Sequence, residues 1–149
     1  MHKNQNVNKQ PLLDIQNRPR RLRKNGWIRE MVAEHRLHPS DLILPIFVID
    51  GKNRRDAVTS LPGVDRQSID IACETAKAAA DLGIPAIALF PVTPQELKCE
   101  NGAEALNPNN VICRAIAAIK SAVPNIGIIT DVALDPYTIH GHDGITDKI

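Results

Sequence analysis

The stretch of sequence that decides the fold is DLILPIFVIDG, residues 41–51. Its centre, residues 42–49, is almost entirely apolar, and the turn dipeptide Asp50-Gly51 ends it. A short run without polar alternation is typical of a strand that is covered on both faces, as in a parallel α/β sheet. Pro45 has no N–H to donate, so we expect the strand to be broken, bulged or locally at a sheet edge there.

Two later runs repeat this pattern. Residues 86–90 read AIALF and end at Pro91, and residues 126–132 read IGIITDV. The junctions that lead into them are alike, LGIP at residues 82–85 and AVPN at residues 122–125. We therefore predict three parallel strands joined by helices with right-handed crossovers.

Helical periodicity occupies the segments between these runs. For the first helix we expect Ser68 as the N-cap and Gly83 as the stop. For the second we expect Asn107 as the N-cap and Pro108 as the first helical residue. The two inward stripes are Ile69, Ala72, Cys73, Ala76 and Ala80, then Val111, Ile112, Ala115, Ile116, Ile119 and Val123. Residues 51–67 and 91–106 are polar and are predicted to be loops.

The N-terminal region divides into two parts. Residues 1–17 are polar and without periodicity, which predicts disorder. A basic arm with a short helix over residues 26–35 is predicted for residues 18–40, and the sheet domain for residues 41–149. The run from Arg18 to Lys24 has no interleaved aromatic residues, so it favours a solvated or subunit-contacting segment over a nucleic-acid site.

Composition excludes several classes of protein. Apolar residues make up 43% and charged residues 23% of the 149 positions, and the net charge is +1. This profile is typical of a soluble globular protein and argues against bulk attraction to nucleic acid or to a membrane. No apolar run is long enough for a transmembrane helix, and the first ten residues do not resemble a secretory signal. Three cysteines without a CxxC pair predict buried thiols, no cysteine zinc site and a cytoplasmic setting.

Chemistry is expected where the strands end and the following loops begin. The candidate segments are Asp50-Gly51, Pro91-Val92-Thr93 and, above all, DVALDPYTIHGHDG at residues 131–144. The last segment carries three carboxylates, two histidines and a tyrosine, which suit acid/base work or a hard cation such as Mg²⁺. A polar surface loop whose aspartates cap turns explains the same pattern, so both interpretations stay open.

His140-x-His142 resembles the HxH pair of metal-dependent amidohydrolase barrels. That pair normally projects from the strand itself, whereas here it lies at least eight residues beyond the strand end. Histidines in such loops more often bond to the backbone than bind metal. Lys98, Lys120 and Lys148 are expected to be solvated surface lysines.

Residues 131–144 as a whole resemble the active-site loop of the porphobilinogen synthase family. The resemblance covers residues 18–149 and includes the basic arm and Met31-Val32-x-Glu34. It also includes Asp41 to Val48, Ser60-Leu61-Pro62-Gly63-Val64-x-Arg66, Leu82 to Pro91, and Asn107-Pro108. It implies a (β/α)₈ barrel of which about three βα units are present, with an arm that embraces a neighbouring subunit of a homo-octamer.

The resemblance also implies the chemistry. Members condense two molecules of 5-aminolevulinate into porphobilinogen with loss of two waters, through two lysines that form Schiff bases. Those lysines lie beyond the positions matched here, so the chain alone is expected to be inactive. The third strand is expected to expose an apolar edge that promotes aggregation.

Site residues follow from the same resemblance. Zinc-dependent members carry cysteines where this chain has Ala133, Asp135 and Asp143, so the chain resembles the aspartate-rich, magnesium-associated subgroup. Asp135 and Asp143 are the implied metal ligands, and no zinc is expected at a cysteine site. Asp131 is the implied catalytic residue, in proton transfer or in orienting the substrate amine. Ile139 departs from the small hydroxyl residue usual in the family. Two alternatives are a non-catalytic interaction module and a hydrolase that uses His140, His142 and Asp131.

Overall fold

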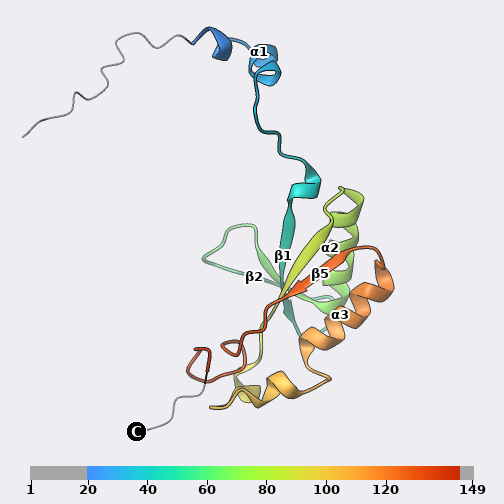
Figure 1. Cartoon of the computed structure of the whole chain (residues 1–149). Coiled ribbons are helices and arrows are strands. Elements are labelled where there is room, and N and C mark those ends of the chain that lie inside the picture. The colour runs from blue at the N-terminus through green and yellow to red at the C-terminus, as the bar shows by residue number, and fades with distance from the viewer. Residues whose placement is uncertain (1–19, 145–149) are drawn as a thin grey trace, which may run out of the picture. The chain divides into compact units, whose positions relative to one another are not determined.

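The computed structural model describes residues 20–144, which form two units divided after Arg36 (Figure 1). The predicted disorder of residues 1–17 lies outside the described residues, as do Arg18 and Lys148. In the part of the chain that the structure describes, no helix is long and apolar enough to cross a bilayer.

The first unit is a short basic segment. It contains a 3₁₀ turn, η1 (Arg21–Arg23), and a helix, α1 (Gly26–Met31). The predicted helix over residues 26–35 is therefore right in place but too long, because Val32 already leaves helical geometry. Its apolar stripe faces solvent, with Trp27 62% and Met31 75% exposed. A helix of six residues gains little without packing, which explains its early end.

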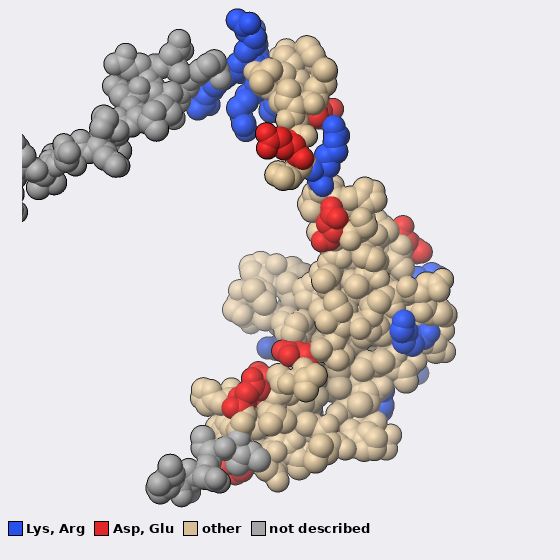
Figure 2. Space-filling view, in the orientation of Figure 1, with Lys and Arg blue, Asp and Glu red and all other residues tan. Residues whose placement is uncertain are grey.

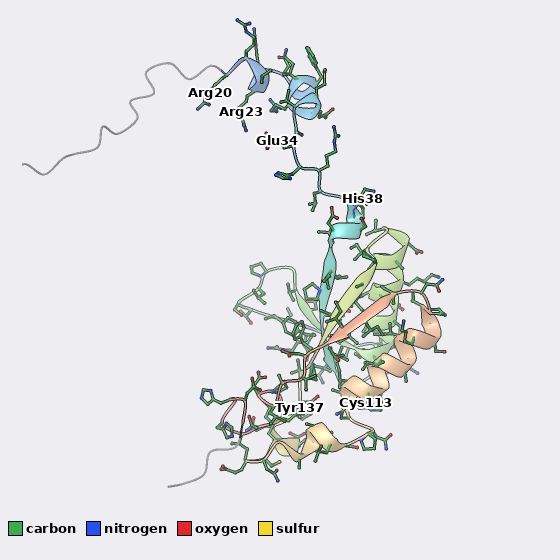
Figure 3. All side chains as sticks on the ribbon, viewed as in Figure 1. Arg20, Arg23, Glu34, His38, Cys113 and Tyr137 are labelled. Carbon is green, nitrogen blue, oxygen red and sulfur yellow. The ribbon has the colours of Figure 1, made fainter. Side chains whose placement is uncertain are left out.

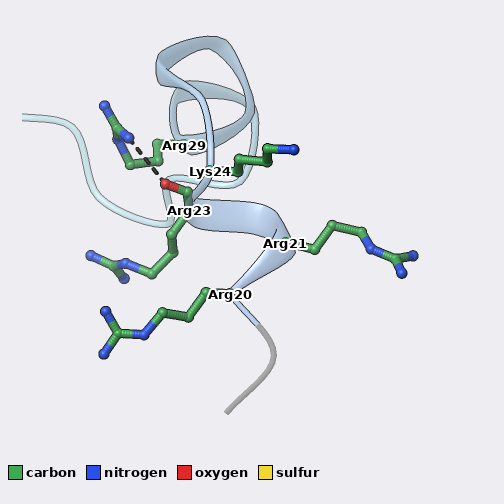
Figure 4. A pocket seen from close by; sticks show the side chains of 5 residues that line it. All are labelled: Arg20, Arg21, Arg23, Lys24 and Arg29. Atoms are coloured by element: carbon green, nitrogen blue, oxygen red, sulfur yellow. Dashed lines mark hydrogen bonds between the residues drawn. The ribbon is translucent and has the colours of Figure 1, made fainter.

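Positive side chains dominate this first unit (Figure 2). Five of them surround an open concavity: Arg20, Arg21, Arg23, Lys24 and Arg29 (Figure 4). The guanidinium of Arg29 donates to the Arg23 carbonyl oxygen at 3.1 Å, which ties the start of α1 to the preceding turn.

The second unit is built on a mixed sheet with the order β2-β3-β1-β4-β5. Its strands are β1 (Ile43–Ile49), β2 (Arg55–Ala57), β3 (Asp65–Ser68), β4 (Ala86–Pro91) and β5 (Gly127–Thr130). The three predicted strands are confirmed as β1, β4 and β5, which run parallel.

The prediction of a loop over residues 51–67 is wrong. This segment contains β2 and β3, which pair antiparallel, and β3 also pairs parallel with the carboxyl end of β1. The side chains of β2 and β3 are mostly polar, such as those of Arg55, Asp65 and Arg66. Backbone pairing at the edge of an existing sheet needs no apolar alternation, so the pattern of hydrophobic residues does not reveal these strands.

The backbone of Pro45 faces an edge of β1 where no neighbouring strand is paired at that position. The N–H of Val92 donates to the Val48 carbonyl oxygen at 2.9 Å, so even-numbered residues of β1 direct their backbone groups toward β4. Pro45 therefore faces the opposite edge, where pairing with β3 begins only at Phe47. The expectation of a locally unpaired edge is confirmed, and the strand continues without a break.

Two helices cover one face of the sheet, α2 (Ile69–Asp81) and α3 (Val111–Ala122) (Figure 1). Their buried residues pack against alternate positions of β1 and β4 to form one hydrophobic core. The core contains Ile46, Val48, Ala72, Ala76, Ala79, Ile87, Leu89, Val111, Ala115, Ile119 and Ile126. Because strand side chains alternate between faces, Phe47 and Phe90 lie on the other face of the sheet, away from the helices.

The ends of the helices confirm most of the predicted signals. Ser68 occupies the N-cap position of α2, although its hydroxyl bonds to Arg54 and Asp70 instead of capping. Gly83 has a φ of 82° and begins a Schellman ending, in which the N–H of Ile84 donates to Ala79 at 3.0 Å.

The prediction that Asn107 caps the second helix is wrong. Asn110 caps α3, and its side-chain oxygen accepts the N–H of Cys113 at 2.9 Å. Asn107 instead stabilises the turn before the helix, through bonds to Glu104 and to the N–H of Asn109. Asn occurs at both positions, and only the backbone path decides which one caps the helix.

The three cysteines are all free thiols in this structure. The prediction that all three are buried is wrong, because Cys113 is exposed and Cys73 and Cys99 are partly buried. Burial raises the pKa of the Cys73 thiol above its ordinary value.

Candidate active site

A cavity of about 430 Å³ lies on the face of the sheet away from the helices, at the carboxyl ends of β1 and β4. The rings of Phe47 and Phe90 form part of its wall, with centroids 5.8 Å apart and planes inclined at 44°. The other lining residues are Val58, Arg66, Pro91, Val92, Thr93, Lys98, Asp135, Pro136 and Gly141. Two of the predicted chemical segments, residues 91–93 and the loop after β5, therefore meet here.

The cavity contains charges of both signs. Arg66 comes from β3, Lys98 follows the 3₁₀ turn η3 (Gln95–Leu97), and Asp135 comes from the loop after β5. The expectation of a solvated surface lysine is only partly met by Lys98, which is partly buried where it lines this wall. It holds for Lys120, an exposed residue whose Nζ donates to the carbonyl oxygens of Pro124 and Ile126.

Thr93 has a buried hydroxyl without a hydrogen-bond partner among the described residues. The residue is only 8% exposed and lines this cavity and two neighbouring ones. An unsatisfied buried hydroxyl is costly, so such groups commonly bond to water or to a ligand. Thr93 is therefore a candidate binding group.

The loop of residues 131–144 has a defined internal structure. Asp143 Oδ1 accepts the backbone N–H groups of Leu134 at 2.6 Å and Asp135 at 3.1 Å. Thr138 donates its hydroxyl proton to the carbonyl oxygen of His142 at 3.1 Å. The predicted turn-capping role is confirmed for Asp143, and the same contacts bring Asp143 next to Asp135.

A second segment holds this loop in place. The N–H of Cys99 donates to Tyr137 and the N–H of Ile139 donates to Cys99, each at 3.2 Å. Gly102, with a φ of 62°, lies closely over the same bridge, where an added Cβ would be 3.4 Å from the methyl group of Thr138. The loop is thus fixed to the segment that follows β4, which also carries Lys98.

Tyr137 is the buried anchor of the loop (Figure 3). It lines a small cavity with Glu104, Asn110 and Val111, at the turn η4 (Ala103–Leu106) and the start of α3. Burial, with smaller contributions from Cys113 and Glu104, raises the pKa of the Tyr137 phenol above its ordinary value. Tyr137 is therefore neutral at physiological pH and serves packing in this position.

His140 and His142 interact with the backbone and with each other. Their rings are stacked, with centroids 6.0 Å apart. His140 Nδ1 accepts the N–H of His142 at 3.2 Å, so its Nε2 carries the proton and donates to the Glu100 carbonyl oxygen at 3.3 Å. Both ring nitrogens of His140 are used in this way, which supports the predicted backbone role over a metal-binding pair.

The three predicted site aspartates do not converge. Asp131 is exposed directly after β5 and does not line the cavity, Asp135 lines it, and Asp143 caps the loop. Within residues 20–144, no three His, Cys, Asp or Glu side chains are close enough to hold a metal ion. One Asp143 oxygen is already bonded to the backbone, so any ion held by Asp135 and Asp143 would need further ligands.

Comparison with known proteins decides the family. The family model described as delta-aminolevulinic acid dehydratase matches residues 16–149. The chain belongs to the delta-aminolevulinic acid dehydratase family. Porphobilinogen synthase is the other name of these dehydratases, so the family predicted from the loop and the strand motifs is confirmed.

Two dehydratases and one solved structure illustrate the similarity. The chain is 54% identical over 135 residues to delta-aminolevulinic acid dehydratase of Bradyrhizobium diazoefficiens, covering 91% of this chain and 38% of that protein. The Chlamydia pneumoniae dehydratase is 46% identical, with coverage of 89% and 40%. The Toxoplasma gondii dehydratase, crystallised with its reaction product porphobilinogen, is 42% identical and aligns with a TM-score of 0.80 over 92% of this chain and 39% of that one. The chain thus spans about two fifths of the length of these dehydratases.

The sequence did not reveal all the residues that line the cavity. Phe47 and Phe90 were identified as strand residues, and Arg66 was assigned to a loop. The phenylalanines carry a usable signal, because each is an aromatic residue near the carboxyl end of a parallel strand. The strand of Arg66 is not visible in the hydrophobic pattern, so the signal for this residue is its place in the family motif of residues 60–66.

Proposed function

We propose that this chain supplies the first part of a porphobilinogen synthase, which condenses two molecules of 5-aminolevulinate into porphobilinogen with loss of two waters. The observation that carries the proposal is the cavity at the carboxyl ends of β1 and β4. The chain's family match covers every residue that lines it. Active sites of (β/α)₈ barrels are built at this end of the strands.

The architecture supports a partial barrel of three βα units. Strands β1, β4 and β5 are parallel neighbours, and helices cover one face of their sheet. The other face carries the partly exposed Ile43 and Ile129, beside the cavity with Phe47 and Phe90. In a closed barrel this face becomes the packed interior. Full activity therefore belongs to the whole barrel, and we expect the chain alone to lack the Schiff-base lysines.

Asp131 is proposed as an acid/base residue that transfers a proton or orients the substrate amine. It directly follows β5, whose carboxyl end lies beside that of β4. Its exposed position leaves the carboxylate available to a substrate once the barrel closes around it.

A chimaera tests these proposals directly. Residues 16–149 would replace the matching part of the Bradyrhizobium diazoefficiens dehydratase, and porphobilinogen formation would be measured. We expect an active chimaera and a loss of about 10²–10⁴ in kcat for Asp131→Asn. Asp81→Asn, at the far end of α2, is the matched control. A folded but inactive chimaera would contradict the proposed function, and an active Asp131→Asn chimaera would contradict the role of Asp131.

A second experiment tests the missing lysines. The 149-residue chain would be incubated with 5-aminolevulinate and borohydride, and its intact mass measured. We expect an unchanged mass, because no lysine of this chain matches a Schiff-base position of the family. A reduced adduct would show that Lys98 or another lysine of this chain reacts with the ketone.

Magnesium remains part of the proposal through the aspartate-rich loop. Asp135 and Asp143 offer the hard oxygen donors that Mg²⁺ prefers, and Mg²⁺ often keeps several waters and takes only one or two carboxylates. Any bound Mg²⁺ would need further ligands beyond this pair. In the chimaera, activity that survives chelation would contradict membership of the magnesium-associated subgroup.

Assembly and location are proposed from the same family resemblance. We propose that the basic arm, with its exposed Trp27 and Met31, contacts a neighbouring subunit of a homo-octamer in the cytoplasm. Sedimentation of the chimaera with and without residues 16–36 tests this. An unchanged oligomer after removal of the arm would contradict it.

A further inference from the structure

Two walls of the cavity come from segments that are far apart in the sequence. Lys98 lies in the segment that follows β4, whereas Asp135 and Gly141 lie in the loop that follows β5. The pairing of β4 with β5 ends at Leu89 and Thr130, before either of these segments begins. The separation of the two walls therefore depends on contacts that are made beyond the sheet.

Two backbone hydrogen bonds provide one such contact. The N–H of Cys99 donates to the Tyr137 carbonyl oxygen, and the N–H of Ile139 donates to that of Cys99, each at 3.2 Å. They make an isolated bridge between Cys99 and Thr138, which belongs to none of the strands. Backbone bonds without neighbouring rungs open at a low cost in free energy. A further contact is therefore needed to keep the walls in register.

The side chain of His140 provides that contact. Its Nε2 donates to the Glu100 carbonyl oxygen at 3.3 Å, and its Nδ1 accepts the N–H of His142 at 3.2 Å. The first bond joins the two segments, while the second stays within the loop and fixes the tautomer of the ring. Glu100 lies two positions after Lys98, and His140 directly precedes Gly141, so the bond to Glu100 is anchored beside both walls.

We infer that His140 is a positioning residue, which holds the loop that carries Asp135 against the segment that carries Lys98. Its ring extends the backbone bridge at Cys99 by a third hydrogen bond between the same two segments. His140 is not among the residues that line the cavity, so it acts through them and not on the substrate. The inference rests on the proposed function in treating these walls as part of the active site.

Two substitutions separate the two bonds of the ring. The amide nitrogen of His140→Gln reaches about as far as Nε2 and keeps a donor for Glu100, whereas His140→Asn is shorter and keeps only an acceptor for the N–H of His142. Hydrogen exchange of the Cys99 and Ile139 amides would be measured in the 149-residue chain. We expect exchange to be about three- to tenfold faster in His140→Asn and His140→Ala, and close to that of the wild type in His140→Gln.

His142→Ala is the matched control. It removes the ring that stacks on His140 and keeps the backbone N–H that Nδ1 accepts, so we expect exchange to change by less than about twofold. The ¹⁵N shifts of the His140 ring, recorded in alkaline buffer, should show a proton on Nε2 and none on Nδ1. A proton on Nδ1 would overturn the inference, because that ring neither accepts the His142 N–H nor donates to Glu100.

The active chimaera shows whether this position matters for the reaction. His140→Ala and His140→Asn should lower kcat by roughly tenfold with little change in KM or in melting temperature, and His140→Gln should restore kcat, because misaligned walls slow the chemical step. Unchanged exchange in every variant, equal effects of Gln and Asn, or wild-type kcat in His140→Ala would overturn the inference. A wild-type chimaera that forms no porphobilinogen would sink the proposed function, and the exchange data would still decide whether His140 holds the two segments together.

Discussion

The carboxylate of Asp143 accepts the backbone N–H of Leu134 at 2.6 Å, across nine residues of the loop that follows β5. The same oxygen accepts the N–H of Asp135 at 3.1 Å, so one side chain closes the loop that carries the candidate chemistry. This contact needs only an oxygen acceptor, whereas the binding of a cation such as Mg²⁺ at the same position is strengthened by the negative charge of the carboxylate.

Substitutions of Asp143 separate these two roles. Asp143→Asn keeps an oxygen acceptor, so we expect amide hydrogen exchange at Leu134 and Asp135 to remain slow. Asp143→Ala removes the acceptor and should speed exchange there by about tenfold, equivalent to roughly 1–2 kcal/mol. In the active chimaera, equal loss of activity in both variants would show that the charge matters and not the cap alone.

Asp70 is predicted to stabilise the protein in a pH-dependent way. Its carboxylate accepts the hydroxyl of Ser68 at 2.5 Å and the N–H of Asn53 at 2.7 Å, and these bonds hold the pKa of Asp70 below its ordinary value. A lowered pKa in the folded state contributes stability that is complete above about pH 4. That contribution is lost as the pH falls through the lower pKa of the folded protein.

Urea unfolding at pH 7 and pH 2.5 checks this prediction. Asp70→Asn should lower the free energy of unfolding at pH 7, and its difference from the wild type should shrink at pH 2.5. Glu74→Gln removes another carboxylate from α2 without these bonds and is the control. A difference of the same size at both pH values would show that Asp70 acts through packing and not through its charge.

The buried hydroxyl of Thr93 is predicted to lower the free energy of unfolding. Replacing its unpartnered hydroxyl with the methyl group of Thr93→Val should raise the free energy of unfolding by about 1 kcal/mol. Thr75→Val is the matched control, because Thr75 donates to Gln67 Oε1 at 2.8 Å, and it should lose about 1 kcal/mol. If Thr93→Val also loses stability, the hydroxyl has a partner such as an ordered water.

The free edge of β5 is predicted to drive self-association. Within residues 20–144 this strand pairs only with β4, and the neighbouring Val132 is 102% exposed. Exposed strand edges pair with other chains, and a charged side chain at the edge opposes this. Val132→Lys should therefore reduce association measured by sedimentation velocity. Leu106→Lys, at an 87% exposed position away from the edge, should have little effect. A wild-type chain that is already monomeric at high concentration would contradict the prediction.

The sequence by itself determined the parallel strands, the two helices and the family. Apolar runs ended by Pro91 or by Asp50-Gly51, and helices ended by Gly83, are local signals, because burial on both faces and backbone conformation act on neighbouring residues. Local reasoning also favoured backbone bonding for the histidines, and it offered turn capping by the aspartates as one of two open interpretations.

Only the tertiary structure decided which residues share the cavity. Arg66 belongs to a polar edge strand that no hydrophobic pattern marks, and Lys98 looks like any surface lysine in the sequence. The choice of Asn110 over Asn107 as the helix cap was equally hidden. These features depend on where the backbone brings distant segments together, as β3 pairs with β1 and Cys99 pairs with Thr138. The burial of a side chain and the charges around it depend on which distant segments pack against it. They therefore cannot be predicted from local sequence patterns.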